Sequence, residues 1–195
     1  MSAKLNPIIK FQEWFDLATE KEITDPNAMC LSTVDDKNTP HSRMVLLKDY
    51  NNEGFIFYTN YESNKGNDIL KKANVCLNFH CKSLLRQIRI EGKVEKISKE
   101  TSDKYFNSRH YLSRIGAWAS NQSKVLKSRE DLENKIEFYK NKYPEKENCP
   151  RPDYWGGFIV KYSKIEFWED MPHRIHKREV FEFKDNDWVS YTLSP

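Results

Sequence analysis

The spacing of apolar residues changes from helical to strand-like soon after the N-terminus. In the first part of the chain, apolar side chains recur every three or four residues, at Ile8, Phe11, Phe15 and Ala18. This spacing predicts an amphipathic helix over residues 8–21. After Asp25-Pro26-Asn27, short runs of branched and aromatic residues follow, separated by groups of Asp, Asn and Gly. These runs predict consecutive antiparallel strands at Ala28–Val34, Ser42–Leu47 and Gly54–Thr59.

The middle of the chain mixes helix and strand signals. Ser63 is a suitable N-cap for a short helix over Asn64–Lys72. The next stretch of helical composition is Lys99–Ala119, and we expect a break in it near Arg109-His110 or at Gly116. Strand-like runs separate these two helical segments, and they predict strands at Asn74–His80 and Arg86–Ile97.

The last third of the chain begins with a helix and ends in strands. Ser128-x-x-Asp131 resembles a capping box that opens the helix. Strand-like runs then predict strands at Gly157–Trp168, Arg174–Phe183 and Trp188–Leu193. Because the connections between successive strands are short, most pairs are expected to be antiparallel. The whole pattern predicts a mainly β fold with helices (α+β), a closed or nearly closed antiparallel barrel with helices packed on its outside.

Composition then narrows the broad class. A chain of 195 residues and 23.3 kDa fits one domain over residues 1–195, with its helical N-terminal segment at about residues 7–21. No apolar run approaches the length needed to cross a bilayer, so no membrane partner is expected. The 32 basic and 29 acidic residues leave a net charge of +3, a balance too even to predict nucleic acid as a partner.

Two features bear on the cellular compartment. The segment Met1–Lys10 lacks the basic-then-apolar layout of a secretory signal, so a cytoplasmic location is expected. The cysteines are scattered, without a C-x-x-C pair or matching histidine spacing, at Cys30, Cys76, Cys81 and Cys149. We expect reduced, structural thiols, with neither a disulfide scaffold nor a metal site. The chain also lacks the glycine-rich motifs of Rossmann and P-loop nucleotide sites.

Tyr105, Arg109 and Ser113 recur every four residues within the helical stretch. On a continuous helix they share one face and present a hydroxyl, a guanidinium and a second hydroxyl in a row. Such a row suits a phosphate monoester, because arginine binds two phosphate oxygens at once and hydroxyls bind the third. A solvated helix face with one aromatic residue in the core explains the same spacing, and spacing alone favours that simpler interpretation.

A second basic group lies near the C-terminus. Arg174, His176 and Arg178 alternate with Ile175 and Lys177, and in a strand this spacing places the first three on one face. Two arginines beside a histidine repel one another unless an anion or an acidic partner neutralises them. The segment suits either an anion site or a solvated strand face balanced by nearby acidic residues, and the pattern does not separate the two.

Further polar groups are weaker candidates. Ser63-Asn64-Lys65 lies at a predicted helix start, where free N–H groups and a lysine favour an anion, although ordinary N-capping explains it equally well. Arg43 and Lys48 point to opposite faces of a straight strand, so one ligand can use both only through a bulge or a site shared between subunits. Neutral side chains suited to a heterocycle or a phosphate occur at Gln87, Gln122 and Ser123.

Taken in chain order, these segments resemble the pyridoxamine 5'-phosphate oxidase family. Arg43-Met44-Val45-Leu46-Leu47-Lys48 is similar to the family's R-x-V-L-L-K strand, and Phe57-Tyr58-Thr59-Asn60 with Ser63 and Lys65 is similar to its F-Y-T-N-x-x-S-x-K segment. The other similar motifs follow in the family's order: Arg86-Gln87, Tyr105-Phe106-x-Ser108-Arg109, Ser113-x-Ile115-Gly116-Ala117-Trp118, Gln122-Ser123, Trp155-Gly156-Gly157-Phe158, Phe167-Trp168 and Arg174-x-His176-x-Arg178. The match runs from about Asn6 to the C-terminus.

The resemblance implies an FMN-binding split β-barrel that works as a homodimer, with each FMN held at the subunit interface. By similarity, Arg174 and His176 meet the pyridine ring of the substrate and act as the catalytic residues. The residues implied for the substrate phosphate are Lys48, Tyr105, Arg109 and Ser113. The residues implied for FMN are Arg43, Met44, Val45, Leu46, Leu47, Lys48, Tyr58, Thr59, Lys65, Gln87, Gln122, Ser123, Trp168 and Arg178.

The implied reaction is the oxidation of pyridoxamine 5'-phosphate and pyridoxine 5'-phosphate to pyridoxal 5'-phosphate, in vitamin B6 metabolism. Oxygen accepts the electrons and gives hydrogen peroxide, and the amine substrate also releases ammonia. Two alternatives stay open: a related split-barrel flavoenzyme of phenazine-type biosynthesis, and a non-catalytic carrier of FMN or pyridoxal phosphate. Retention of Tyr105, Arg109 and Ser113 argues against the phenazine alternative.

The chain departs from the family pattern in three places. It begins almost at the first helix, so the family segment that can cover the substrate is expected to be missing. Asn64 stands where the family usually has an arginine beside the lysine, which removes one positive charge from the implied FMN phosphate site. We therefore expect a lower FMN affinity, or a greater dependence on Lys65 and Arg43. At the C-terminus, Thr192-Leu193-Ser194-Pro195 replaces the usual Arg-Leu-x-Pro.

Overall fold

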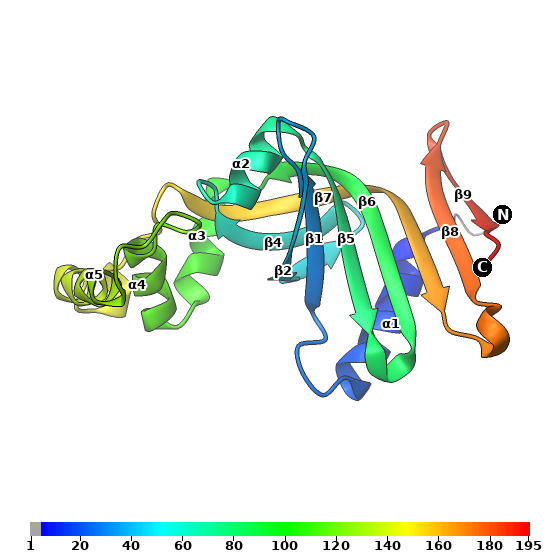
Figure 1. Ribbon diagram of the computed structural model, residues 1–195, viewed down its shortest axis with the longest axis horizontal. Helices are drawn as coiled ribbons and strands as arrows, with labels where there is room; N and C mark the ends of the chain where they lie inside the picture. Colours follow the sequence, from blue (N-terminus) through cyan, green and yellow to red (C-terminus); the bar gives the residue numbers. More distant parts are fainter. Residues whose placement is uncertain (1–4) are drawn as a thin grey trace.

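The computed structural model describes residues 5–195 (Figure 1). The first four residues, part of the segment considered above for a secretory signal, lie outside the described residues. The helices are α1 (Pro7–Lys21), α2 (Asn64–Lys71), α3 (Lys99–Ser108), α4 (Tyr111–Ala119) and α5 (Arg129–Lys142). The strands are β1 (Ala28–Val34), β2 (Pro40–Leu46), β3 (Asp49–Asn51), β4 (Gly54–Asn60), β5 (Asn74–Cys81), β6 (Arg86–Lys96), β7 (Trp155–Glu169), β8 (Lys177–Lys184) and β9 (Asp187–Thr192).

One antiparallel sheet contains these strands. Its order is β2-β1-β5-β6-β7-β4-β3, and β8 and β9 extend it from β7. The 15 residues of β7 pair with β6 along most of their length, with β4 through Trp155–Val160, and with β8 through Lys164–Glu169. The sheet therefore divides at β7, because β4 occupies the free side of its first half and β8 that of its second half.

The sheet curls until its two edges meet. Strand β2 at one edge leads directly into β3 at the other, and the Lys48 N–H donates to the Ile56 carbonyl at 2.9 Å. The enclosed core is aromatic and branched, and its fully buried members include Phe55, Phe57, Phe79, Ile88, Ile90 and Val160. This arrangement confirms the predicted mainly β fold, a nearly closed antiparallel barrel with peripheral helices.

Helix α1 seals one end of the barrel. Asn6 caps it by accepting a hydrogen bond from the Ile8 N–H at 3.1 Å, and proline occupies its first position. The Phe11 ring is fully buried and meets Tyr50, Phe55 and Phe79 edge-on, with centroid distances of 4.8, 4.8 and 5.6 Å. The helical spacing of apolar residues in this segment therefore predicted the face that packs on the barrel.

Helices α3, α4 and α5 form a separate layer at one end of the long axis (Figure 1). They enclose a second, smaller hydrophobic cluster built on Phe106, Ile115, Cys149 and Trp155. Trp155 is also the first residue of β7, so this layer is attached to the barrel where the long strand begins. The break expected near Arg109-His110 is confirmed, because α3 ends at Ser108 and α4 begins at Tyr111.

The structure differs from the predicted strands in two places. Strand β3 was missed because it has only three residues, too few to show alternation. The predicted strand Arg174–Phe183 begins instead at Lys177, because Pro172–Arg174 forms a 3-10 turn in which His173 and Arg174 have positive φ angles of 59° and 62°. Arg174, His176 and Arg178 therefore do not share one strand face, since only Arg178 belongs to a strand.

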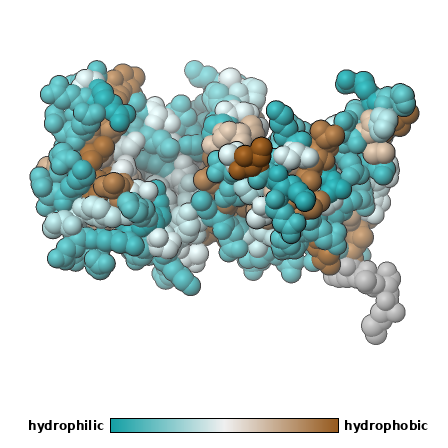
Figure 2. All heavy atoms as spheres, turned by 90° about the horizontal axis from the view of Figure 1, so that it is seen from below, coloured by the Kyte–Doolittle hydropathy of each residue, from teal (hydrophilic) through white to brown (hydrophobic). Residues whose placement is uncertain are grey.

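The surface shown in Figure 2 is mainly hydrophilic, with hydrophobic side chains in small separate groups. Among residues 5–195, no helix combines the length and the apolar character needed to cross a membrane.

The packing of α1 gives a first prediction. Replacing Phe11 by alanine leaves a cavity between three aromatic rings, so the free energy of unfolding should fall by about 3–5 kcal/mol. Ile9→Ala on the same helix is the matched control, because Ile9 is 60% exposed, and it should change stability by less than about 0.5 kcal/mol. Urea unfolding followed by circular dichroism measures both, and equal losses in the two variants would contradict the packing described.

Candidate active site

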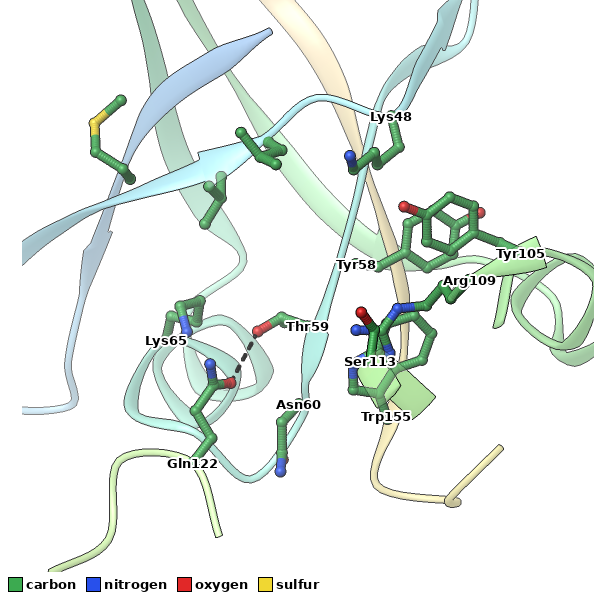
Figure 3. Close-up of a pocket in the computed structure, with 13 residues that line it drawn as sticks. Lys48, Tyr58, Thr59, Asn60, Lys65, Tyr105, Arg109, Ser113, Gln122 and Trp155 are labelled. Carbon is green, nitrogen blue, oxygen red and sulfur yellow. Dashed lines mark hydrogen bonds between the residues drawn. The ribbon is translucent and has the colours of Figure 1, made fainter. Parts of the chain in front are cut away.

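A cavity of about 510 Å³ opens between the barrel and the helical layer (Figure 3). Three strands supply part of its wall, through Met44, Val45 and Leu46 of β2, Tyr58, Thr59 and Asn60 of β4, and Trp155 of β7. The helices and loops supply Lys48, Lys65, Tyr105, Arg109, Ser113 and Gln122. The cavity therefore combines flat aromatic walls with cations and hydroxyls, a chemistry suited to a phosphorylated aromatic ligand.

Three aromatic rings form a stack along one side of the cavity. The rings of Tyr105 and Tyr58 lie 3.8 Å apart and 12° from parallel, and Trp155 follows Tyr58 at 5.6 Å and 11°. Desolvation in this stack, followed by the charge of Tyr105, raises the pKa of Tyr58 to about 12. Its hydroxyl therefore stays neutral at any physiological pH.

Arg109 is the cation in this cavity that lacks an acceptor for one of its buried N–H groups. Its guanidinium lies 4.6 Å from the centroid of the Trp155 ring. Its Nη1 atom is buried and has no hydrogen-bond partner among residues 5–195. Burial lowers the pKa of Arg109, while Tyr105 opposes that shift. Because a desolvated guanidinium without an acceptor is unfavourable, this geometry calls for an anion in the cavity.

The interrupted helix does not prevent Tyr105, Arg109 and Ser113 from meeting. Tyr105 lies in α3, Arg109 caps the end of that helix, and Ser113 lies in α4, yet all three line the cavity (Figure 3). The continuous helix face that the four-residue spacing suggested is therefore absent. The break between α3 and α4 turns the chain so that the three side chains still face one space.

A second pair of cations lies beside the first turn of α2. Lys65 lines the cavity, and its Nζ lies 3.5 Å from Ser63 Oγ. Burial, and next the charge of Arg43, lowers the pKa of Lys65. Arg43 does not line the cavity, because its Nη1 donates to Thr33 Oγ1 at 2.6 Å and to backbone carbonyls. Asp68 partly balances this pair, at 3.7 Å from Arg43.

Five of the predicted site residues lie elsewhere. Gln87, Trp168 and Arg178 are direct neighbours across β6, β7 and β8, so they form one row on the sheet. The His176 ring lies 4.6 Å from the Trp168 ring, and its Nδ1 is 2.8 Å from the Asp170 carboxylate. Arg174 is exposed on the preceding turn. We call these five residues the β8 cluster: Gln87, Trp168, Arg174, His176 and Arg178.

The β8 cluster is far from the cavity within one chain. Trp155 and Trp168 lie near opposite ends of β7, and at a rise of about 3.3 Å per residue they are separated by up to about 40 Å. Figure 1 agrees, because the helical layer and β8 lie at opposite ends of the long axis. No small ligand can touch both groups in one chain.

The remaining site residues are placed as follows. The Leu47 side chain is buried in the main core, and Ser123 does not line the cavity. Asn60 and Trp155 line the cavity, although the sequence interpretation did not name them as site residues. Both belong to motifs noted in the sequence, so the signal for them was present: Asn60 ends the F-Y-T-N run and Trp155 begins W-G-G-F.

Comparison with known proteins agrees with this site. Residues 15–142 match the family model described as pyridoxamine 5'-phosphate oxidase. Residues 155–195 match the model described as the pyridoxine 5'-phosphate oxidase C-terminal dimerisation region. The chain belongs to the pyridoxamine 5'-phosphate oxidase family.

Relatives support the family over almost the whole chain. The chain is 52% identical to the pyridoxine/pyridoxamine 5'-phosphate oxidase of Bartonella quintana, over 97% of this chain and 92% of that protein. It is 48% identical to the enzyme of the same name from Pelagibacter ubique, over 98% of this chain and 93% of that protein. The match of residues 155–195 to a dimerisation region supports a homodimer of this chain.

Solved structures show the same fold. PhzG from Burkholderia lata 383, in complex with tetrahydrophenazine-1-carboxylic acid, superposes with a TM-score of 0.92 at 25% identity, covering 100% of this chain and 95% of that chain. A pyridoxamine 5'-phosphate oxidase-related, FMN binding protein from Nostoc punctiforme superposes with a TM-score of 0.78 at 14% identity, covering 99% of this chain and all of that chain.

The aromatic stack gives a second prediction. Because the pKa of Tyr58 is about 12 in the folded protein and 10.0 without perturbation, the neutral phenol stabilises the fold below pH 10. That contribution should be lost as the pH rises from about 10 to about 12. Ultraviolet titration of the wild type and Tyr58→Phe measures the ionisation of this one residue by difference, and a midpoint near 10 would contradict its burial in the stack.

Proposed function

We propose that this chain oxidises pyridoxamine 5'-phosphate and pyridoxine 5'-phosphate to pyridoxal 5'-phosphate, with FMN as cofactor and oxygen as electron acceptor. The observation that carries the proposal is the unpartnered, buried Nη1 of Arg109 in an aromatic-walled cavity. A ligand with a phosphate and a flat ring satisfies both features. The proposal is supported by 48–52% identity to relatives named as pyridoxine/pyridoxamine 5'-phosphate oxidases.

The substrate phosphate is assigned to Arg109 with Tyr105, Ser113 and Lys48. Arg109 offers a forked donor over the Trp155 ring, and the two hydroxyls lie in the same cavity. The Lys48 ammonium also lines the cavity (Figure 3). Such a set holds a phosphate by charge-assisted hydrogen bonds and leaves the attached ring free to lie flat between aromatic walls.

The residues near α2 fit the phosphate of FMN. Arg43 and Lys65 are two partly buried cations, and the charge of Arg43 helps to lower the pKa of Lys65, so an anion bound beside them relieves that repulsion. Because Asn64 contributes no charge and Asp68 lies beside Arg43, this end of the site depends on these two cations.

The proposed FMN contacts are Met44, Val45, Leu46, Leu47, Lys48, Tyr58, Thr59, Gln122 and Ser123 in the same chain, and Gln87, Trp168 and Arg178 in a second copy. When bound, FMN supplies a hydride acceptor that oxygen reoxidises to give hydrogen peroxide.

The β8 cluster is assigned to the same site through a second copy of the chain. It lies within residues 155–195, apart from Gln87 on the neighbouring strand, and those residues match the dimerisation region. A homodimer that places the β8 cluster of one copy over the cavity of the other completes two identical sites. Arg174 and His176 then face the pyridine ring of the substrate as the catalytic residues.

The backbone of Arg174 supports this role. Positive φ angles at the consecutive residues His173 and Arg174 are unfavourable for side chains with a Cβ. Strained backbone of this kind is found at functional sites, where the surrounding structure holds it. The His176 ring packs at a tilt against the Trp168 ring, and its Nδ1 lies 2.8 Å from the Asp170 carboxylate, so these contacts attach the turn to the sheet. Arg174 is thereby presented on a fixed turn rather than on a flexible strand end.

The structural likeness to PhzG favours a phenazine-type alternative. The ligand named in that complex carries a carboxylic acid and no phosphate. The cavity here offers Arg109, Tyr105 and Ser113 together with Lys48, more donors than one carboxylate uses. Identity is also 25% to PhzG against 48–52% to the named oxidases, so the phosphorylated vitamers are the better candidates.

The anaerobic reduction of bound flavin tests the proposal directly. Purified protein loaded with FMN should lose its yellow absorbance when pyridoxamine 5'-phosphate or pyridoxine 5'-phosphate is added without oxygen, and regain it in air with release of hydrogen peroxide. Pyridoxamine without phosphate is the matched control and should bleach the flavin far more slowly. If neither phosphorylated vitamer bleaches the bound flavin, the proposed oxidase activity is ruled out, and a non-catalytic carrier of FMN or pyridoxal phosphate is favoured.

Mixed dimers test the shared site. A chain with Arg109→Ala and a differently tagged chain with Arg174→Ala should each be nearly inactive. A heterodimer purified through both tags contains one site free of substitutions, so it should recover about half of the wild-type activity. The matched control pairs Arg109→Ala with Lys48→Ala, both in the cavity, and should stay inactive. Recovery in the control and not in the first pair would contradict the assignment.

A further inference from the structure

Arg114 is a buried arginine directly after Ser113. Its side chain is only 3% exposed, and its backbone belongs to α4. Among residues 5–195, no carboxylate lies within ion-pair distance of its guanidinium. Burial of an unpaired charge is unfavourable unless hydrogen bonds compensate it. The position of Arg114 therefore needs an explanation beyond packing.

The guanidinium of Arg114 donates to residues at the α3–α4 break and to the loop that follows α5. Its Nε donates to the Arg109 carbonyl at 3.3 Å, and its Nη1 donates to the Lys146 carbonyl at 2.9 Å. Its two terminal nitrogens also contact the side-chain and main-chain oxygens of Asn107. Asn107 lies in the last turn of α3 and Arg109 caps that helix, so their carbonyls are among those that a helix end leaves without partners.

This arrangement fixes the main chain of Arg109. Helix α3 stops at Ser108, and the chain must turn there for Arg109 to lie over Trp155. Arg114 binds the carbonyls on both sides of Ser108, which holds the turn in one conformation. The negative end of the α3 dipole offsets part of the cost of burying this charge.

The charge of Arg114 also acts on Arg109. It contributes to the lowered pKa of Arg109, after burial, as a nearby like charge. Two guanidinium groups close together, without a carboxylate on Arg114, create a positive potential at the cavity wall. An anion bound by Arg109 gains from both charges although it touches only one of them.

We propose that Arg114 is a positioning residue for phosphate binding, which holds the Arg109 main chain at the α3–α4 break and adds a second positive charge behind it. This inference rests on the proposed function only for the identity of the phosphorylated ligand. The site that it describes is the phosphate subsite itself, and inorganic phosphate probes that subsite independently of oxidation.

The test compares three single variants and one double variant. For Arg114→Gln, the KM for pyridoxamine 5'-phosphate should rise about 10-fold, which corresponds to about 1.4 kcal/mol, with kcat within about 2-fold of the wild type. Arg114→Lys keeps the charge but not the fork of donors, so its KM should rise less. Arg109→Gln should show the larger loss. In Arg109→Gln/Arg114→Gln, the second substitution should raise KM by clearly less than the roughly 10-fold that it causes alone, because the positioning part of its effect acts through Arg109.

Two controls separate positioning from general loss of structure. Tyr111→Phe removes another hydrogen bond from α4, between the Tyr111 hydroxyl and the Tyr143 carbonyl, and should lower the melting temperature without changing KM. Arg129→Gln removes an exposed charge from α5 and should change neither property. If Arg114→Gln only lowers the melting temperature, or if its effect is fully additive with that of Arg109→Gln, the inference is overturned.

Binding of inorganic phosphate, measured by calorimetry on the same FMN-loaded proteins, keeps the two proposals distinct. A wild type that binds phosphate but does not oxidise pyridoxamine 5'-phosphate refutes the proposed function alone. Weaker phosphate binding by Arg114→Gln than by Arg129→Gln then supports the inference. A wild type that binds no phosphate, or an Arg114→Gln variant that binds it as well as the wild type, overturns it.

Discussion

The pairing of β7 with three other strands controls where everything else in the molecule lies. Its 15 residues pair with β6 along most of their length, while β4 and β8 divide the opposite side between them. The first half carries Trp155 and the wall of the cavity, and the second half carries Trp168 and the β8 cluster. Because backbone pairing makes this strand rigid and extended, its two functional ends cannot approach one another within one chain.

Among residues 5–195, the cavity cations Arg109 and Lys65 have no carboxylate within ion-pair distance, and Arg43 beside them has Asp68 at 3.7 Å. Arg109, Lys65 and Arg43 all have lowered pKa values for which burial is the leading cause. In contrast, Arg86 is paired with Glu169 at 2.8 Å and Arg178 with Glu166 at 2.7 Å. A fold that leaves some of its buried cations uncompensated keeps a preorganised place for anions, at some cost in stability.

Local patterns in the sequence predicted most of the fold. The spacing of Phe11 and its neighbours gave the buried face of α1, and Ser63 and Ser128 were correctly expected to cap α2 and α5. These features succeed because caps and hydrophobic periodicity depend on residues a few positions apart. The turn at His173 and Arg174 was missed because alternating residues look the same whether or not positive φ angles interrupt the strand.

The sequence by itself determined the barrel class, the family, and the residue types suited to phosphate binding. Only the tertiary structure decided which of those residues share a space: Tyr105, Arg109 and Ser113 meet across a helix break, whereas Arg174 lies on the turn before β8, outside that cavity. It also showed that Arg109 has a buried donor without a partner. Burial and proximity result from contacts between segments distant in the chain, and no local pattern of residues encodes those contacts.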